Sequence, residues 1–410
     1  MEHYRLRTLD PDDEDFSDLE PLREIVGDAR VVAVGESTHR IHEFYQLRHR
    51  VTRFLVRELG FTGMVMESGF PEGLAVNDWV RGGPGDLDTL LHDGITYRFG
   101  RCDEMRGQLE WLRSRDGQVR FYGMDVPGSS ATNEPAIESC LPLLDDVDPS
   151  YAKVIRETLL PLFDYLPADR SGRAWAAPAL QAYMALDPAR RYEITARVGA
   201  LAERMQAMRV VYGGGDRVDA AIRCAATARH MDAFQEAMAD AATRTYPAVN
   251  IRDAAMAENV EWILEREDRI VVGAANSHVQ RQPLWAPPVI NNKLTTLGQH
   301  LAAALGDDLV VIGTTFGGGT LALHRPLLDG PPGHTELFTQ QVGPFEPDTI
   351  DAKLSAVGLP LHLTDLRQAR SVAATKIMLD SQSYPVDPAT AFDALVHIDA
   401  VTPWHAFPTA

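Results

Sequence analysis

Five short runs of apolar residues recur along the chain, and both faces of each run are apolar. They are ARVVAVG (29–35), TGMVMES (62–68), QVRFYGMD (118–125), RIVVGAAN (269–276) and DLVVIGTTF (308–316). Short runs of this kind are typical of parallel strands that helices cover on both sides. Segments with helical periodicity lie between them, at about 41–59, 102–115 and 251–267. We therefore predict an α/β fold with a mainly parallel sheet flanked by helices.

The middle of the chain has a different pattern. From about residue 134 to residue 245 it is rich in Ala, Arg and Leu at helical spacing, without a convincing strand. We predict a large all-helical insertion that folds over the sheet. The chain then divides into a first part of the α/β core (1–133), the helical insertion (134–245) and a second part of the core (246–410).

Charge and composition limit the partners of the chain. Its 58 acidic and 39 basic residues give a net charge of −19, which argues against binding to nucleic acid or to an anionic membrane. The N-terminus lacks a signal pattern, and no apolar run reaches roughly 18 residues. We expect a cytoplasmic monomer or homodimer that binds a small molecule.

Familiar cofactor and metal motifs are missing from the sequence. No GxSxG elbow, Walker A loop or GxGxxG follows a strand, and the three cysteines are widely scattered. The spacing of His39, His42 and Glu43 is neither HExxH nor HxxEH, so we predict no zinc site there. We expect no cofactor and no metal.

Polar side chains follow several of the predicted strands. Ligands of open parallel sheets bind outside the carboxyl ends of the strands, so these side chains are expected to converge. The strand ends carry Glu36 and His39, Glu67 and Ser68, Asp125, Asn276 and His278, and Thr314 and Thr315.

The first strand end, VVAVGESTH (31–39), is followed by a helix with an unusual arginine. Arg48 falls near the middle of the apolar face of this helix, whereas His42 and His49 lie on the other face and are expected to be solvated. A buried guanidinium needs a carboxylate partner, for which Glu36 and Glu67 are the candidates. The alternative is an arginine that extends to solvent at the helix edge.

The chain resembles the erythromycin esterase family over most of its length. The segments that carry the resemblance are VGESTHRIHEFYQLRHRVTRFLVRELGF (34–61), MVMESGFPEGLAVNDWV (64–80), YGMDVPG (122–128), IRDAAMAENVEWIL (251–264), GAANSHV (273–279), LGQHLAAALGDDLVVIGTTFGGGT (297–320) and FDALVHIDAVTP (392–403). The resemblance implies an α/β core with a helical insertion over a deep cleft. It also implies metal-independent hydrolysis of an ester or lactone in a bulky natural product.

Site residues follow from the resemblance by position. The catalytic candidates are the general base His39, with Glu36, Arg48, Glu67 and His278. Apart from this resemblance, the candidates for substrate binding are Asp125, Ser68, Asn276, Arg252 and Thr315, of which all but Arg252 lie at the ends of predicted strands.

The chain departs from the family pattern at two positions, and the departures leave alternatives open. Ala275 stands where many members have a histidine, and Arg40 where glycine is common. If His39 takes its proton from a substrate hydroxyl or carbon instead of from water, the reaction becomes a cyclisation, elimination or rearrangement. A further alternative is a resistance protein that binds its ligand without turnover.

Overall fold

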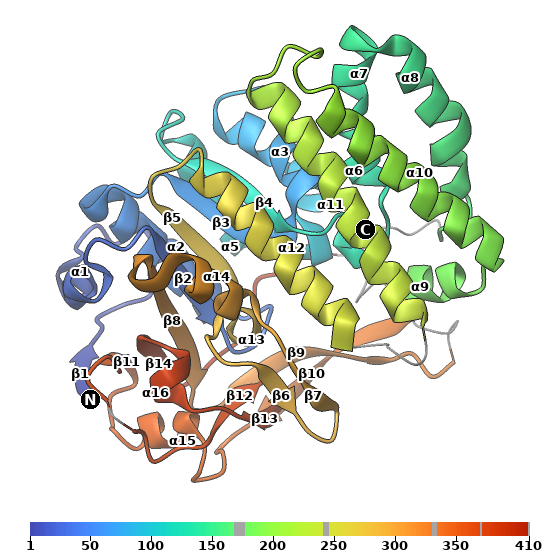
Figure 1. Ribbon diagram of the computed structural model, residues 1–410. Coiled ribbons are helices and arrows are strands. Elements are labelled where there is room, and N and C mark those ends of the chain that lie inside the picture. The colour runs from blue at the N-terminus through green and yellow to red at the C-terminus, as the bar shows by residue number, and fades with distance from the viewer. Residues whose placement is uncertain (168–176, 241–245, 330–333, 370, 409–410) are drawn as a thin grey trace.

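The computed structural model describes residues 1–167, 177–240, 246–329, 334–369 and 371–408 (Figure 1). Its centre is an eight-stranded sheet in the order β1–β11–β14–β8–β2–β5–β3–β4. Neighbouring strands from β14 to β4 are parallel, whereas β11 and β1 are antiparallel at one edge. The strands are β1 (Glu2–Arg5), β2 (Val31–Glu36), β3 (Gly63–Gly69), β4 (Arg120–Asp125), β5 (Ile270–Ala275), β8 (Leu309–Phe316), β11 (Leu361–Asp365) and β14 (Ala394–Ile398).

The predicted α/β fold is confirmed, and the five predicted strands are direct neighbours in the sheet. They correspond to β8, β2, β5, β3 and β4. The sequence did not predict β14, which extends the parallel part beside β8, or the antiparallel edge formed by β11 and β1.

Helices cover both faces of the sheet, as alternate residues of β2 show. Val32 and Val34 belong to a core shared with α2 (His42–Leu59) and α5 (Asp103–Arg113). Val31 and Ala33 belong to a second core with α12 (Tyr246–Leu264) and α14 (Leu297–Leu305). Successive side chains of a strand point to opposite faces, so a strand buried on both faces is apolar throughout.

The middle of the chain is helical in its described residues. Between residue 134 and residue 240 these contain helices and no strand, whereas 168–176 lie outside the described residues. The longer helices there are α7 (Leu141–Val147), α9 (Ala177–Met184), α10 (Pro188–Ala207) and α11 (Asp216–Ala239). In Figure 1 α11 runs beside α12, which itself covers the sheet. The domain limits at residues 133 and 245 stay a prediction.

Shorter elements surround this framework. They include α1 (Pro21–Val26), α3 (Phe70–Val80), α6 (Glu134–Glu138), α8 (Pro149–Val154), α13 (Asn276–Val279), α15 (Ile350–Ser355) and α16 (Pro388–Ala391). Three two-stranded ribbons pair β6 (Leu284–Ala286) with β7 (Ile290–Leu294), β9 (Gly319–Pro326) with β10 (Thr335–Val342), and β12 (Lys376–Leu379) with β13 (Gln382–Pro385). Among the described residues no helix is both long and apolar enough to cross a bilayer.

The polar face of α2 is buried, and the expectation that His49 is solvated is wrong. His49 is 5% exposed, and its ring packs against Trp111 of α5 at 5.6 Å between centroids. The N-terminal segment covers the same face, because Asp18 lies 2.7 Å from the guanidinium of Arg50. Sequence periodicity could not reveal that the N-terminal segment, with its short 3-10 helix Ser17–Leu19, packs there.

Candidate active site

Glu36, at the carboxyl end of β2, contacts a histidine and an arginine. Its Oε1 lies 2.6 Å from Nδ1 of His39, and its Oε2 accepts a hydrogen bond of 3.0 Å from Nη1 of Arg48. His39 lies in the turn between β2 and α2, whereas Arg48 reaches back from the second turn of α2. Arg48 is 3% exposed, so the expected carboxylate partner is confirmed as Glu36 and the solvent-exposed alternative is wrong.

The backbone next to Arg48 makes room for its side chain. A Cβ atom at Gly273 of β5 would lie 2.5 Å from Cδ of Arg48, so this position needs glycine. The guanidinium lies 4.4 Å from the centroid of the Tyr45 ring. Its Nε and Nη2 have no hydrogen-bond partner among the described residues. Arg48 is therefore held mainly by the Glu36 carboxylate and the Tyr45 ring.

Glu67, at the end of β3, belongs to a second group of charged residues. Arg252 of α12 lies between two acids, with Nη2 2.9 Å from Oε1 of Glu67 and 2.5 Å from Oδ2 of Asp125. The other oxygen of Glu67 accepts a hydrogen bond of 3.0 Å from the backbone N–H of Ala275. Nε2 of His278 lies 3.4 Å from Glu67 and 3.1 Å from Nη1 of Arg252.

Asp253 completes the second group, and the sequence did not predict it. Its Oδ2 lies 3.0 Å from Nδ1 of His278 and accepts a hydrogen bond of 2.8 Å from the backbone N–H of Leu297. Tyr97 was also missed. Its hydroxyl donates to Asp125 at 2.8 Å, and its ring lies 5.4 Å from the guanidinium of Arg252. The only sequence signal for Asp253 was its position next to Arg252.

The charges of the two groups alter each other's pKa values. Burial alone would lower the pKa of His39, but the hydrogen bond that it donates to Glu36 and the charge of Glu67 outweigh burial and raise the pKa. The pKa of His278 is likewise raised against the effect of burial, by Asp253 and Glu67. Burial would raise the pKa of Glu67, yet His278, His39 and Arg252 lower it to about 2. Glu67 is therefore ionised and stabilises positive charge on both imidazoles.

Three candidates for substrate binding make hydrogen bonds within the fold instead. Asn276 donates to the carbonyl of Thr314 at 2.7 Å, and so ties the end of β5 to the end of β8. Ser68 accepts a hydrogen bond of 2.9 Å from the backbone of Thr96. Thr315 lies 2.9 Å from His397 of β14, on the side of β8 opposite Thr314. Among the described residues, no hydrogen bond joins these three side chains to His39 or His278.

A segment after β14 supports the turn that carries His39. The backbone of Trp404 donates to the carbonyl of Arg40 at 2.9 Å, and Ile41 forms a bridge with Pro403. The backbone of His42 donates to the carbonyl of Thr402 at 3.0 Å. Arg40 has a φ of 64°, in the left-handed region that glycine adopts without strain. This observation gives a physical reason for the glycine that is common at this position in the resembled family.

Comparisons with known proteins point to one family. The family described as erythromycin esterase matches residues 56–401, a range that includes Glu67 and His278 but begins after His39. Erythromycin esterase type II of Escherichia coli is 29% identical over 334 residues, covering 78% of this chain and 77% of that protein. Erythromycin esterase type I of Escherichia coli is 23% identical over 405 residues and 95% of each chain. An erythromycin esterase variant solved in an open conformation superposes with a TM-score of 0.83 at 20% identity, covering 98% of each chain.

Proposed function

The chain belongs to the erythromycin esterase family and is an esterase, and we propose that it hydrolyses the lactone ester of a macrolide-like natural product. In this proposal His39 is a general base that activates water, and no metal ion takes part in the reaction. The observation that carries the proposal is the 2.6 Å contact between Nδ1 of His39 and Oε1 of Glu36. The macrolide class is supported by the names of the two Escherichia coli relatives.

The Glu36 contact prepares His39 to accept a proton. With the Nδ1 proton directed at Glu36, the free electron pair of the neutral ring is on Nε2. Nε2 has no hydrogen-bond partner among the described residues, and the side chain is 28% exposed. A water proton moves to Nε2 while the water oxygen bonds to the ester carbonyl carbon. The imidazolium that forms is stabilised by Glu36 and Glu67, a type of catalysis typically worth about 10²–10⁴ in rate.

The second group supplies positive charge for the intermediate. Arg252 and His278 are the cationic candidates, and Glu67, Asp125 and Asp253 hold them in place. The positive charge of Arg252 and of a protonated His278 stabilises the carbonyl oxygen as it becomes negative. Both ring nitrogens of His278 already have partners in the fold, so its contribution is its charge and not a free donor. The protonated His39 then returns its proton to the departing alkoxide.

Mass spectrometry tests the reaction. We expect a macrolide from a panel that includes erythromycin to gain the mass of one water, and the His39→Ala variant to lose about 10² or more of kcat. His92→Ala, which changes an exposed histidine beside Asp93, is the matched control. Full activity of His39→Ala would refute the assignment of the base. A product of unchanged mass indicates cyclisation, loss of water indicates elimination, and binding without turnover indicates a resistance protein.

A further inference from the structure

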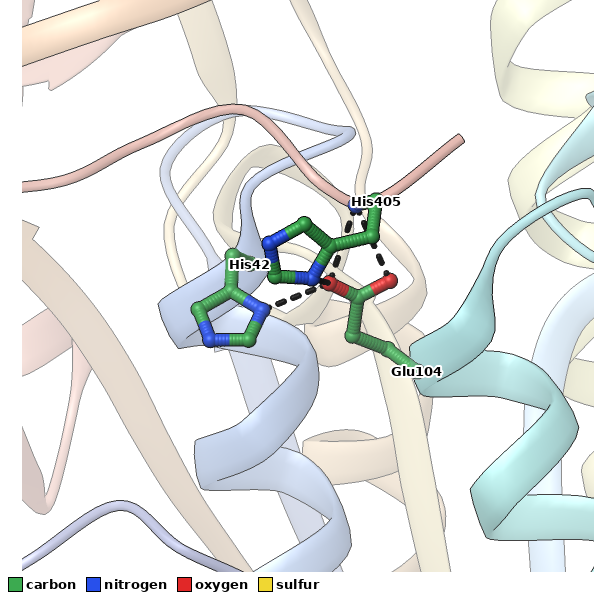
Figure 2. A group of neighbouring side chains, drawn as sticks. All are labelled: His42, Glu104 and His405. Atoms are coloured by element: carbon green, nitrogen blue, oxygen red, sulfur yellow. Dashed lines mark hydrogen bonds and ion pairs between the residues drawn. The ribbon is translucent and has the colours of Figure 1, made fainter. Parts of the chain in front are cut away.

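A cluster of two histidines and one glutamate lies beside the turn that carries His39 (Figure 2). His42 is the first residue of α2, Glu104 is in the first turn of α5, and His405 lies in the segment after β14. Nδ1 of His42 is 2.5 Å from Oε1 of Glu104, and Nδ1 of His405 is 2.9 Å from the same oxygen. Three separate parts of the chain thus direct one ligand-type atom each toward the same point.

We propose that this cluster is a binding site for a divalent transition-metal ion of the zinc class. Two imidazole nitrogens and one carboxylate oxygen are a common donor set for such ions. All three donor atoms lie within 4.8 Å of one another. The two nitrogen–oxygen distances of 2.5 and 2.9 Å are shorter than the roughly 3.4 Å that separates ligands bound to one tetrahedral ion, so the site must open to bind it. When the ion binds, the Nδ1 proton of each neutral imidazole is transferred through solvent to Nε2, and the Nδ1 atoms of His42 and His405 move away from the Glu104 oxygen to admit the ion.

The surroundings of Glu104 favour this function. Its two oxygens accept hydrogen bonds of 3.0 and 3.2 Å from the backbone N–H of His405, so the carboxylate has a fixed orientation. Carboxylate ligands of metal sites are oriented by hydrogen bonds of this kind. The side chain of Glu104 is 5% exposed, whereas that of His405 is 62% exposed. The ion therefore has a buried anionic ligand on one side and access for a water ligand on the other.

The position of the cluster indicates a structural function. His42 and Thr402 are joined by a backbone hydrogen bond of 3.0 Å, and Thr402 also donates to Glu43. An ion bound by His42 and His405 ties the segment after β14 to the start of α2 a second time. Its ligand His42 is three residues after His39 in the sequence. The ion therefore stabilises the turn of the proposed base without contacting the reacting atoms. This proposal does not depend on the proposed function.

Direct metal binding tests the site. A tag-free chain freed of metal by chelation is titrated with Zn²⁺ by calorimetry and, separately, with Co²⁺ by visible absorption. We expect one ion per chain, a tetrahedral Co²⁺ spectrum and a higher Tm with Zn²⁺ but not with Mg²⁺. His405→Ala and Glu104→Gln are each expected to weaken binding at least about tenfold. The control His92→Ala, which has a carboxylate neighbour but no second imidazole, is expected to bind like the parent chain.

Several outcomes would overturn the proposal. The first is unchanged Zn²⁺ affinity in both His405→Ala and Glu104→Gln. The second is loss of binding in His39→Ala with retention in His405→Ala, which would place the ion at the proposed active site instead. The third is no binding with Zn²⁺ at tens of micromolar, in which case hydrogen bonds alone hold the cluster. His405→Asn, which keeps a polar side chain in an exposed position, separates loss of a ligand from loss of folding.

Discussion

Nδ1 of His278 lies 3.0 Å from Oδ2 of Asp253, the same arrangement that His39 makes with Glu36 at 2.6 Å. Each imidazole therefore has a carboxylate on Nδ1, and Glu67 raises the pKa of both. In the proposed reaction the two histidines need opposite charge states. His39 must be neutral to accept a proton, whereas His278 must be charged to add positive charge beside the carbonyl oxygen.

Asp253→Asn is expected to reduce kcat and to change its pH dependence. Without the negative charge of Asp253 the pKa of His278 falls, so the positive charge on His278 is lost at a lower pH. The alkaline limb of kcat therefore moves to lower pH. We expect kcat to fall about 10²–10⁴-fold, the range for loss of an orienting carboxylate or of acid–base assistance. Asp268→Asn, at an exposed site before β5, is the control. An unchanged alkaline limb would show that Asp253 has only a structural function.

Glu36→Gln is expected to shift the acid limb of kcat/KM. The raised pKa of His39 places the midpoint of this limb above 6.5 in the parent chain, since the base works only when it is neutral. The glutamine removes the largest favourable contribution to the charged imidazole, so the pKa of His39 falls and the limb moves to lower pH. A pH profile of kcat/KM measures the shift. Movement of the limb to higher pH would contradict the assignment.

Substitutions of the buried pair Arg48 and Glu36 are expected to have strongly non-additive effects on the free energy of unfolding. Arg48→Met leaves the Glu36 carboxylate without its charged partner, and breaking a buried pair typically costs about 3–5 kcal/mol. Arg48→Met combined with Glu36→Gln is expected to recover part of that loss, because neither charge remains. Urea unfolding of the two single variants and the double variant measures the coupling. The control is Arg57→Met on the same helix, whose exposed pair with Glu14 is worth at most about 1 kcal/mol.

Glu72 of α3 is expected to make the free energy of unfolding depend on pH. Burial raises the pKa of Glu72 from 4.5 to about 7, although its carboxylate accepts a hydrogen bond from the backbone of Gly128. The folded chain keeps a proton that the unfolded chain releases above pH 4.5, so the free energy of unfolding falls as pH rises from 4.5 to 7.

Glu72→Gln is neutral at every pH, so it is expected to lack this fall in stability. Relative to the parent chain it gains of the order of 1–3 kcal/mol between pH 4.5 and pH 8. Urea unfolding at both pH values measures the difference, with the exposed Glu157→Gln as control. Parallel pH curves for Glu72→Gln and the parent chain would contradict the raised pKa.

The strands of the sheet could be predicted where burial on both faces made the sequence continuously apolar. Strand β2, with Val31 to Val34, is the clearest case. Strand β14 was missed because its five residues include His397, which is fully buried and lies 2.9 Å from Thr315. A polar histidine in a short segment is typical of a loop. Only the strand order shows that His397 has a hydrogen-bond partner on the neighbouring strand.

The site could be predicted where a residue was anomalous in its element. Glu36 and Glu67 follow apolar strands, and Arg48 lies on an apolar helix face, so each required a partner. Asp253 was missed because α12 has three acids on different sides, and the periodicity of its sequence does not mark which acid is buried. Thr315 was predicted to bind substrate because it lies at the end of a strand. Alternate side chains of a strand point to opposite faces, so position at the strand end alone does not show which residues face the site.

The bridge between Ile41 and Pro403 makes the His39 turn depend on residues from opposite ends of the sequence. During translation the turn is synthesised early, but the segment around Pro403 that supports it is synthesised much later. A nascent chain thus carries the proposed base long before it can hold that base in place. Activity is expected only after residues 402–405 have left the ribosome, and an insertion close behind His405 would sit beside the turn of the proposed base.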